Sequence, residues 1–148
     1  MENKKNLFIN TDGGSRGNPG PAAIGVVFYD ESQEVLYCCK ECIGEATNNE
    51  AEYRAIIKAL EILLKSRWFA ANNQTGSKVV CRLDSLLVVE QINGNYKIKQ
   101  EHIRAFMVRI HELLDQIKLN IIFQHVPREQ NKAADKLVNE ALDGQLKA

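Results

Sequence analysis

The order of strand-like and helix-like patterns along the chain restricts its fold more than any other feature. Residues 6–12 are a predicted strand, which contains the apolar run Leu7 to Ile9. Residues 22–30 and 34–43 are two more predicted strands, and the polar stretch DESQ between them is typical of a hairpin. Residues 47–66 then carry apolar side chains at helical spacing. The chain therefore begins with three predicted strands that a helix follows.

The rest of the chain alternates between the two patterns. Strands are predicted at Lys78 to Leu83 and Leu119 to Val126, and helices at Ser85 to Ile92, at Glu101 to Ile117 and from about Glu129 to Leu142, with an end near Gly144. FAANNQTGSK is a predicted loop, and NGNYKIK is a predicted turn and extended link. The first three strands can pair as a meander, whereas the later ones need helical crossovers and should lie parallel to the first. We therefore expect an α/β fold with one mixed sheet and helices on its faces, in a single domain of residues 1–148.

The composition is that of an ordinary globular protein, and it excludes several functions. The formal net charge is zero, so any attraction to nucleic acid must come from a local patch. No apolar run approaches the roughly 20 residues of a membrane span, and the start MENKKN is not a secretory signal, which predicts a cytoplasmic protein without a membrane partner. Cys39 and Cys42 have the spacing of a zinc knuckle, but no second pair completes a site, so the cysteines are interpreted as reduced thiols.

Four carboxylates stand out because the predicted fold does not need them. They are Asp12, Glu52, Asp84 and Asp135. Each has an ordinary alternative: a turn residue after a strand for Asp12, an N-cap for Asp84 and a solvated helix face for Asp135. Glu52 is harder to explain, because it lies on the apolar face of its helix while Glu50 completes the capping box. Its alternative is a side chain that reaches solvent from the first turn.

Taken together, the four carboxylates indicate a metal site. Asp12 and Asp84 both follow the carboxyl end of a predicted strand, where ligands gather in open α/β sheets, and helix starts can bring Glu52 and Asp135 to the same edge. Like charges converge only when they are neutralised. Oxygen ligands without His or Cys suit Mg²⁺ or Mn²⁺, and two such ions about 4 Å apart can clamp a phosphodiester and activate water.

Five stretches of the chain resemble the type 1 ribonuclease H family. They are TDGGSRGNPGPAAIGVV, TNNEAEYRAIIKAL, DS at Asp84–Ser85, YKIK and VPREQNKAAD, and they are spread in order over nearly the whole chain. The resemblance implies a five-stranded sheet of order 3-2-1-4-5 with the first three strands antiparallel. It also implies hydrolysis of the RNA strand of RNA–DNA hybrids with two Mg²⁺ or Mn²⁺ ions, which leaves 5′-phosphate and 3′-hydroxyl ends. The family's four acidic residues fall on the four carboxylates named above.

The resemblance also implies a set of residues that bind the substrate. These are Gly13, Ser15, Asn18, Asn48, Asn49, Ser85, Lys97, Lys99 and Asn131. The glycines after Asp12 would let the backbone come close to the substrate, although GNPG is equally consistent with a simple turn. Asn48 and Asn49 are also good residues for the start of a helix. Distinguishing RNA from DNA requires polar groups that read the 2′-hydroxyl.

The chain departs from the well-known bacterial enzymes at two places. The mobile His before the last acidic residue is missing from the short loop VPREQN, and His125 is interpreted as a strand-end residue. The basic protruding helix is also missing, which resembles the compact, archaeal-like branch of the family. We predict that Arg128 takes over part of the role of the missing His in catalysis, the alternative being a simple pair with Glu129.

Three functions remain open from the sequence. The first is a metal-dependent endoribonuclease that acts on RNA–DNA hybrids, as a monomer. The second keeps this activity and adds double-stranded RNA as a substrate, because an active site that reads A-like shape and 2′-hydroxyls can accept both. The third is a non-catalytic module that binds nucleic acid on the same scaffold. A basic surface along Lys97, Lys99, Arg104 and Arg109 is predicted for the hybrid, against the alternative of a solvated helix face.

Overall fold

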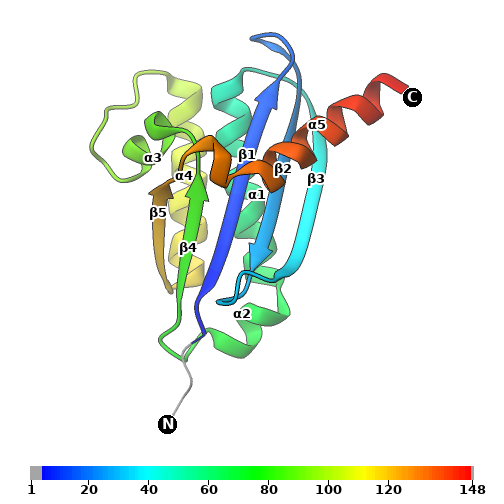
Figure 1. Ribbon diagram of the computed structural model, residues 1–148. Helices are drawn as coiled ribbons and strands as arrows, with labels where there is room; N and C mark the ends of the chain where they lie inside the picture. The colour runs from blue at the N-terminus through cyan, green and yellow to red at the C-terminus, as the bar shows by residue number, and fades with distance from the viewer. Residues whose placement is uncertain (1–4, 148) are drawn as a thin grey trace.

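The structure is a computed structural model that describes residues 5–147. Its elements are β1 (Leu7–Ser15), β2 (Gly20–Tyr29), β3 (Val35–Ala46), α1 (Asn48–Lys65), α2 (Arg67–Asn72), β4 (Lys78–Leu83), α3 (Leu86–Ile92), α4 (Glu101–Ile117), β5 (Asn120–His125), the 3₁₀ turn η1 (Arg128–Gln130) and α5 (Lys132–Lys147). The strands form one sheet of order β3-β2-β1-β4-β5 (Figure 1). The first three strands are antiparallel, and β4 and β5 lie parallel to β1. The predicted fold class and strand order are confirmed.

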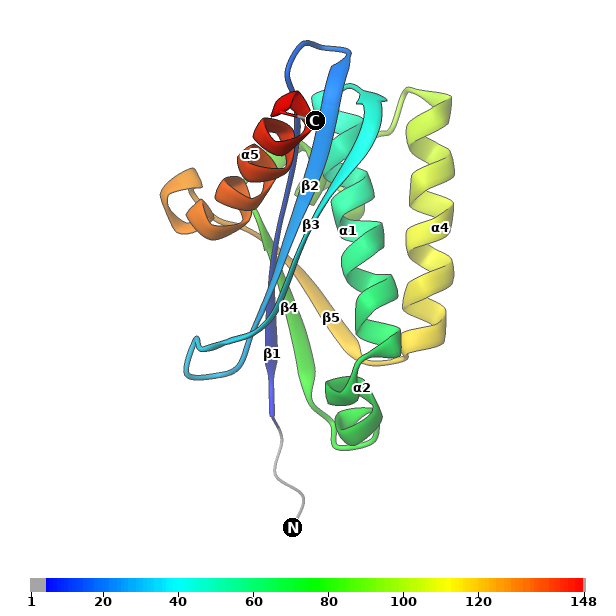
Figure 2. The same cartoon turned by 90° about the vertical axis from the view of Figure 1, so that its right-hand side faces the viewer.

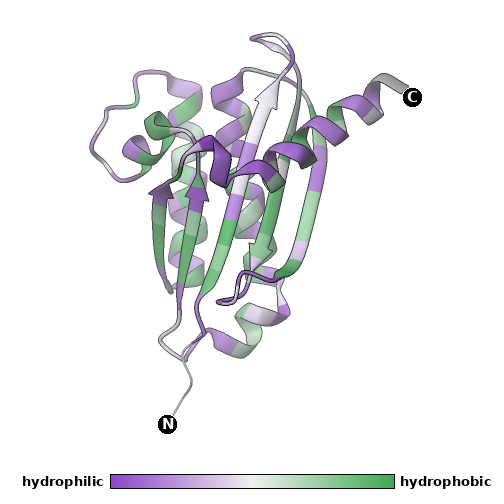
Figure 3. Ribbon diagram, in the orientation of Figure 1, coloured by the Kyte–Doolittle hydropathy of each residue, from purple (hydrophilic) through white to green (hydrophobic). Residues whose placement is uncertain are grey.

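The helices cover the two faces of the sheet unequally. Figure 2 shows α1 and α4 side by side on one face, whereas α5 crosses the other face. The main core lies between the sheet and α1 with α4, and its fully buried side chains include Ile9, Tyr53, Leu60 and Ile110. The ring of Tyr53 stacks on that of Phe106 of α4, with centroids 6.3 Å apart. In Figure 3, apolar residues follow the strands, and hydrophilic residues gather in η1 and the first turns of α5.

Helix α1 begins where the sequence predicts. The Thr47 hydroxyl accepts from the Glu50 amide at 3.1 Å, and the Glu50 carboxylate accepts from the Thr47 amide at 2.8 Å. This capping box satisfies two amides that have no partner within the helix. The box also orients the first turn, so that Glu52 is held near the sheet.

Several element boundaries differ from the prediction, including the start of the last helix, which was expected at about Glu129 but lies at Lys132 after the turn η1. The predicted loop FAANNQTGSK begins within a short helix, α2, because the Ser66 hydroxyl accepts from the Phe69 amide at 3.0 Å and starts a new turn. Strand β1 does not end at Asp12 but runs on to Ser15, paired with β2. Helix α5 passes through Gly144 to Lys147, because a glycine only weakens a helix by about 1 kcal/mol.

Two further expectations concern the membrane and the cysteines. Within residues 5–147, none of the helices has the length and apolarity that crossing a bilayer requires.

All four cysteines are free thiols: Cys81 is buried in the core, whereas Cys38 and Cys42 are exposed on β3. Burial raises the pKa of the Cys81 thiol to about 12, so this side chain acts as a small neutral core residue.

Candidate active site

The ends of β1 and β4 bring Asp12 and Asp84 to the same edge of the sheet. The parallel pairing of these strands stops at Asn10 and Arg82. Asp12 lies two residues further along β1, and Asp84 lies two residues further along the chain from β4's last pair with β1. Because the strands are parallel, the two carboxylates lie next to each other just beyond the last paired residues of β1 and β4. This arrangement is the one that the sequence predicted.

Glu52 reaches this edge because α1 packs directly on β1. Gly13 is buried, and a Cβ at this position would overlap the main-chain carbonyl of Ala51. The glycine therefore lets the first turn of α1 touch the strand, which places Glu52 beside Asp12. The alternative for Glu52, a side chain that simply reaches solvent, does not describe this position.

The carboxylates form a compact cluster. One oxygen each from Asp12, Glu52 and Asp84 lies within 4.8 Å of the others. Asp135 comes from the first turns of α5. This helix can lie close to β2 because Gly25 has no Cβ, which would otherwise overlap the carbonyl of Ala134. Asp135 is outside the group of three, but its charge acts on Asp12.

The electrostatics of the cluster indicate an uncompensated negative charge. Burial, followed by the charges of Asp84, Glu52 and Asp135, raises the pKa of Asp12 to about 8. Burial raises the pKa of Glu52 to about 7, while a hydrogen bond from Ser85 and the charge of Arg128 act in the opposite direction. Converging carboxylates with raised pKa values are stabilised by a cation. The all-oxygen donor set fits a hard divalent ion such as Mg²⁺ or Mn²⁺.

Arg128 lies at the border of the cluster. Its Nε is 4.0 Å from Asp84 Oδ2, and its side chain is 84% exposed. Within the part of the chain that the structure describes, no ion pair joins it to Glu129, the alternative partner that the sequence left open. Most of its guanidinium is therefore free to meet an anion from solution.

A surface hollow of about 470 Å³ opens beside Glu52. Its lining includes Asn18, Asn48, Asn49 and Ser85, four of the residues that were predicted to bind substrate. Asn18 Oδ1 accepts from the Asn48 amide at 3.0 Å, which ties the turn after β1 to the start of α1. Ser85 also caps α3, because its hydroxyl accepts from the Val88 amide at 3.3 Å.

A neighbouring hollow of about 390 Å³ contains Lys97 and Lys99, and it shares Asn49 with the first. The predicted basic surface is shorter than expected, however. Arg109 turns away to Glu61 at 3.1 Å and Glu112 at 3.8 Å, so it does not extend the surface.

Two predicted substrate-binding residues occupy the interior instead. Gly13 is buried under α1, as described above, and Asn131 is fully buried with its amide hydrogen-bonded to β1. These contacts pack α1 against β1 and hold the start of α5 to β1. Ser15 lies near the hollow, with its amide donating to Asn48 Oδ1 at 2.9 Å.

His102 is a site residue that the sequence reasoning missed. It lines the hollow beside Glu52, and its Nε2 is 3.7 Å from Glu50 Oε2. No motif marks it, because it approaches the site only through the packing of α4 against α1. His125, by contrast, ends β5 as an exposed residue, as predicted.

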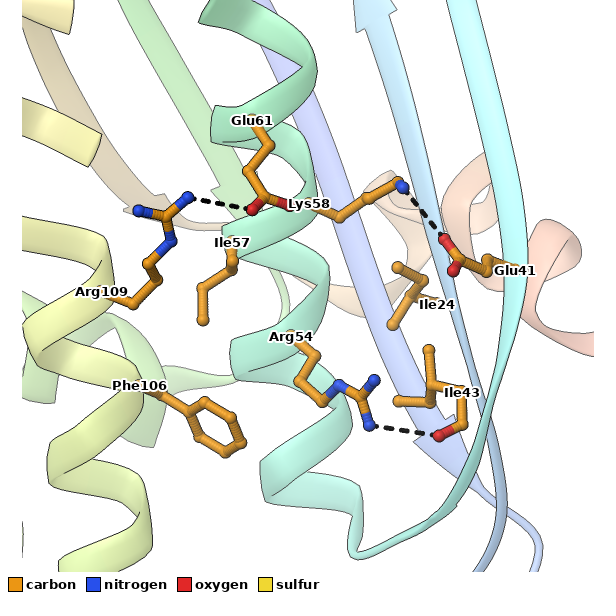
Figure 4. Close-up of a pocket in the computed structure, with 9 residues that line it drawn as sticks. All are labelled: Ile24, Glu41, Ile43, Arg54, Ile57, Lys58, Glu61, Phe106 and Arg109. Atoms are coloured by element: carbon orange, nitrogen blue, oxygen red, sulfur yellow. Dashed lines mark hydrogen bonds and ion pairs between the residues drawn. The ribbon is translucent and has the colours of Figure 1, made fainter. Parts of the chain in front are cut away.

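The molecule has another pocket, of about 320 Å³, on the outer side of α1 (Figure 4). Its charged side chains satisfy one another: Lys58 pairs with Glu41 at 3.3 Å, and Glu61 pairs with Arg109 of α4. Arg54 donates to the main-chain oxygen of Ile43 at 3.1 Å. These contacts join α1 to β3 and α4, which indicates a structural role, so the carboxylate cluster remains the candidate site.

Comparison with known proteins gives a consistent result. The model of a family described as "Reverse transcriptase-like" matches residues 10–141. Ribonuclease HI of Halobacterium salinarum is 42% identical over 132 residues, which are 89% of this chain and 62% of that protein. A bifunctional protein of Mycobacterium tuberculosis is 40% identical over 138 residues, or 93% of this chain. The chain spans only 35% of that protein's length.

Solved structures agree with these relatives. LC11-RNase H1, isolated from compost by a metagenomic approach, has a TM-score of 0.86 and 43% identity, with 95% of this chain and 98% of that chain covered. The same enzyme has been solved in complex with an RNA/DNA hybrid, again with a TM-score of 0.86 and 43% identity, with 95% of this chain and 99% of that chain covered.

Proposed function

The chain belongs to the type 1 ribonuclease H family, and from this premise we propose that it is an endonuclease that hydrolyses the RNA strand of RNA–DNA hybrids. The observation that carries the proposal is the carboxylate cluster beside a polar hollow. Asp12, Glu52 and Asp84 present oxygens within 4.8 Å of one another, and the hollow begins at Glu52. A phosphodiester that follows the hollow would meet the cluster.

We propose that Asp12, Glu52, Asp84 and Asp135 hold two Mg²⁺ or Mn²⁺ ions. Support comes from the donor set, which is all oxygen, and from the raised pKa values of Asp12 and Glu52. When bound, such ions activate a water molecule and stabilise the charge that develops on the phosphate oxygens. Cleavage that leaves 5′-phosphate and 3′-hydroxyl ends is the outcome expected for the family.

The chain's own side chains would orient the substrate. Asn48 and Asn49 at the hollow offer amide groups that can hydrogen-bond sugar hydroxyls and phosphates, as RNA recognition requires. Lys97 and Lys99 in the adjoining hollow would neutralise backbone phosphates. Arg128 would pair with a phosphate at the cluster, because its guanidinium is exposed and its planar fork matches two phosphate oxygens.

The test uses labelled RNA–DNA hybrid, RNA duplex and DNA duplex, each with and without Mg²⁺ or Mn²⁺. We expect cleavage of the RNA strand in the hybrid, only with metal, and none of the DNA duplex. Cleavage of the RNA duplex would add the second substrate that the sequence left open. If the protein binds the hybrid but does not cleave it with either metal, the proposed enzymatic function is wrong and a non-catalytic nucleic-acid-binding module is the better description.

A further inference from the structure

A chain of hydrogen bonds, partly buried at Arg82 and buried at Asn10 and Asn131, links β4, β1 and the start of α5. Arg82 Nε donates to Asn10 Oδ1 at 2.7 Å, and Asn10 Nδ2 donates to Asn131 Oδ1 at 3.1 Å. Asn131 Nδ2 then donates to the main-chain oxygen of Thr11 at 2.9 Å. We call this chain of contacts the asparagine relay.

The relay reaches the segments that carry three of the carboxylates. Its first member precedes Asp84 by two residues, and its last acceptor is the carbonyl of the residue before Asp12. Asn131 precedes Asp135 by one helical turn, and its carbonyl accepts from the Asp135 amide at 3.1 Å. A displacement of the relay would therefore move these carboxylates relative to one another.

Backbone pairing does not fix these distances by itself. The ladder between β1 and β4 ends at Asn10 and Arg82, before either strand reaches its carboxylate. Helix α5 is not part of the sheet and packs across it, so its register against β1 depends on side chains. Asn10 Nδ2 also donates to the Gln130 carbonyl at 3.2 Å, which holds the turn η1 in place.

Both ends of the relay are enclosed by further contacts or by burial. The Arg82 guanidinium lies 4.8 Å from the ring centre of Phe8 and 5.5 Å from that of Tyr29, and its Nη2 donates to Gln33 Oε1 at 2.9 Å. At the other end, Asn131 is fully buried. Each amide can satisfy its partners in only one orientation, since its oxygen accepts from the preceding member and its nitrogen donates to the next.

We infer that Asn10 and Asn131 are positioning residues that hold Asp135 in register with Asp12, so that the carboxylates bind divalent ions tightly. The inference rests on the proposed metal-dependent function of this site. Neither asparagine touches the substrate, because Asn10 is 3% exposed and Asn131 is 0% exposed. Their effect passes through the distance between the two carboxylates.

The test measures Mn²⁺ binding without substrate, from the free-ion signal in electron paramagnetic resonance. The variants are Asn131→Ala, Asn10→Ala and the pair together. Asn72→Ala is the matched control, because Asn72 is 8% exposed and donates to the Trp68 carbonyl at 2.8 Å, in α2. All the variants should lower the urea midpoint of unfolding. Only the relay variants should raise the Mn²⁺ dissociation constant, by about tenfold, as loss of a partner that orients ligands does.

Two further measurements distinguish a positioning role from a general loss of stability. The double variant should bind Mn²⁺ no more weakly than Asn131→Ala alone, because both changes break one relay. Hybrid cleavage by Asn131→Ala should recover with excess Mn²⁺, while KM for the hybrid stays within twofold of wild type.

Wild-type Mn²⁺ affinity in both relay variants would overturn the inference and leave the proposed function intact. A tenfold loss of Mn²⁺ affinity in the relay variants, together with a wild-type protein that cleaves no hybrid, would support the inference and reject the proposed function. A wild-type protein that binds no Mn²⁺ would overturn the metal site and this inference together. If Asn131→Ala does not fold, the Mn²⁺ dissociation constant of Asn10→Ala alone tests the inference.

Discussion

The side chain of Asp84 is the sharpest test of the site at the scale of single residues. It is only 10% exposed and contributes one of the three clustered oxygens. Asp84→Asn keeps the shape but removes the charge that a metal ion requires. We expect hybrid cleavage to fall by a factor of 10³ or more, in the range of about 4 kcal/mol of transition-state stabilisation.

The fold of Asp84→Asn should be preserved. In the absence of metal its free energy of unfolding should equal that of wild type or exceed it, because one repelling charge is gone. Circular dichroism and urea unfolding check this point. Near wild-type turnover in the variant would show that the site has been assigned to the wrong residues.

Arg128 is predicted to act through its charge. Its Nε lies 4.0 Å from Asp84 Oδ2 at an exposed position, where the guanidinium can pair with a phosphate. Arg128→Ala should lower kcat by about tenfold or more, and Arg128→Lys should retain part of it, because lysine keeps the charge but not the fork. Mn²⁺ affinity should change little in either variant. Turnover of Arg128→Ala within twofold of wild type would eliminate the role.

The pKa of Asp12 predicts how stability varies with pH in the metal-free protein. Because the pKa is raised from 3.8 to about 8 in the folded state, folding favours the protonated carboxyl, and this contribution to stability is lost progressively as the pH rises from about 4 to about 8. Asp12→Asn removes the penalty. Its advantage in free energy of unfolding should grow from near zero at pH 4 to about 2 kcal/mol or more above pH 8.

Urea unfolding in EDTA across this pH range measures the difference. Asp30→Asn is an opposite control, because hydrogen bonds from Ser32 and from the Glu34 amide lower the pKa of Asp30. That variant should show no gain in alkaline solution. Parallel pH profiles for wild type and Asp12→Asn would contradict the electrostatic description of the cluster.

At the scale of elements, the contact of α1 with β1 depends on Gly13. A Cβ there would overlap the carbonyl of Ala51, which is main chain and cannot rotate away. Gly13→Ala should therefore lower the free energy of unfolding by about 2 kcal/mol, as overpacking does, and displace Glu52 from the cluster. Weaker Mn²⁺ binding should accompany the loss of stability.

Gly144→Ala is the matched control for this change. Nothing lies within 4 Å of a Cβ at Gly144, which sits inside α5. The alanine should therefore raise the free energy of unfolding by about 0.5 to 1 kcal/mol, because glycine is a poor helix former. If Gly13→Ala were as stable as wild type, the close approach of α1 would not be needed.

The elements also show which parts of the fold a sequence reveals. Helix α1 was predictable because eighteen residues carry one apolar face and a capping box. Helix α2 was missed because it has six residues, too few for a periodic pattern, and because Ser66 serves as the end of one helix and the start of the next. Strand β1 was cut short at Asp12 because glycines carry no apolar signal, although here they provide close packing.

The parts of the candidate site that short sequence patterns mark were predictable, and the parts formed by long-range contacts were not. The carboxylates follow strand ends or interrupt an apolar helix face, which is visible in the sequence. The asparagine relay is not visible, because it joins Arg82 and Asn131 to Asn10 across 72 and 121 residues. Such contacts depend on how α5 lies across the sheet, which no short pattern encodes.

At the scale of the whole molecule, the charge distribution decides how a nucleic acid would be attracted. The formal net charge is zero, so the overall field provides no attraction. The carboxylate cluster would repel phosphates until metal ions neutralise it. The hollow next to it carries Lys97 and Lys99, both exposed and, within residues 5–147, in no ion pair. Attraction must therefore be local.

Replacement of Lys97 and Lys99 by Ala together tests this local attraction. Each lysine that contacts a phosphate releases about one counterion, so the pair should reduce the slope of log affinity against log salt by about 2. Hybrid binding at low salt should weaken, and the two affinities should converge as salt rises. Lys65→Ala with Arg67→Ala removes the same charge at the far end of α1, and its slope should match wild type. Equal slopes for both double variants would mean that Lys97 and Lys99 belong to a solvated surface that the hybrid does not touch.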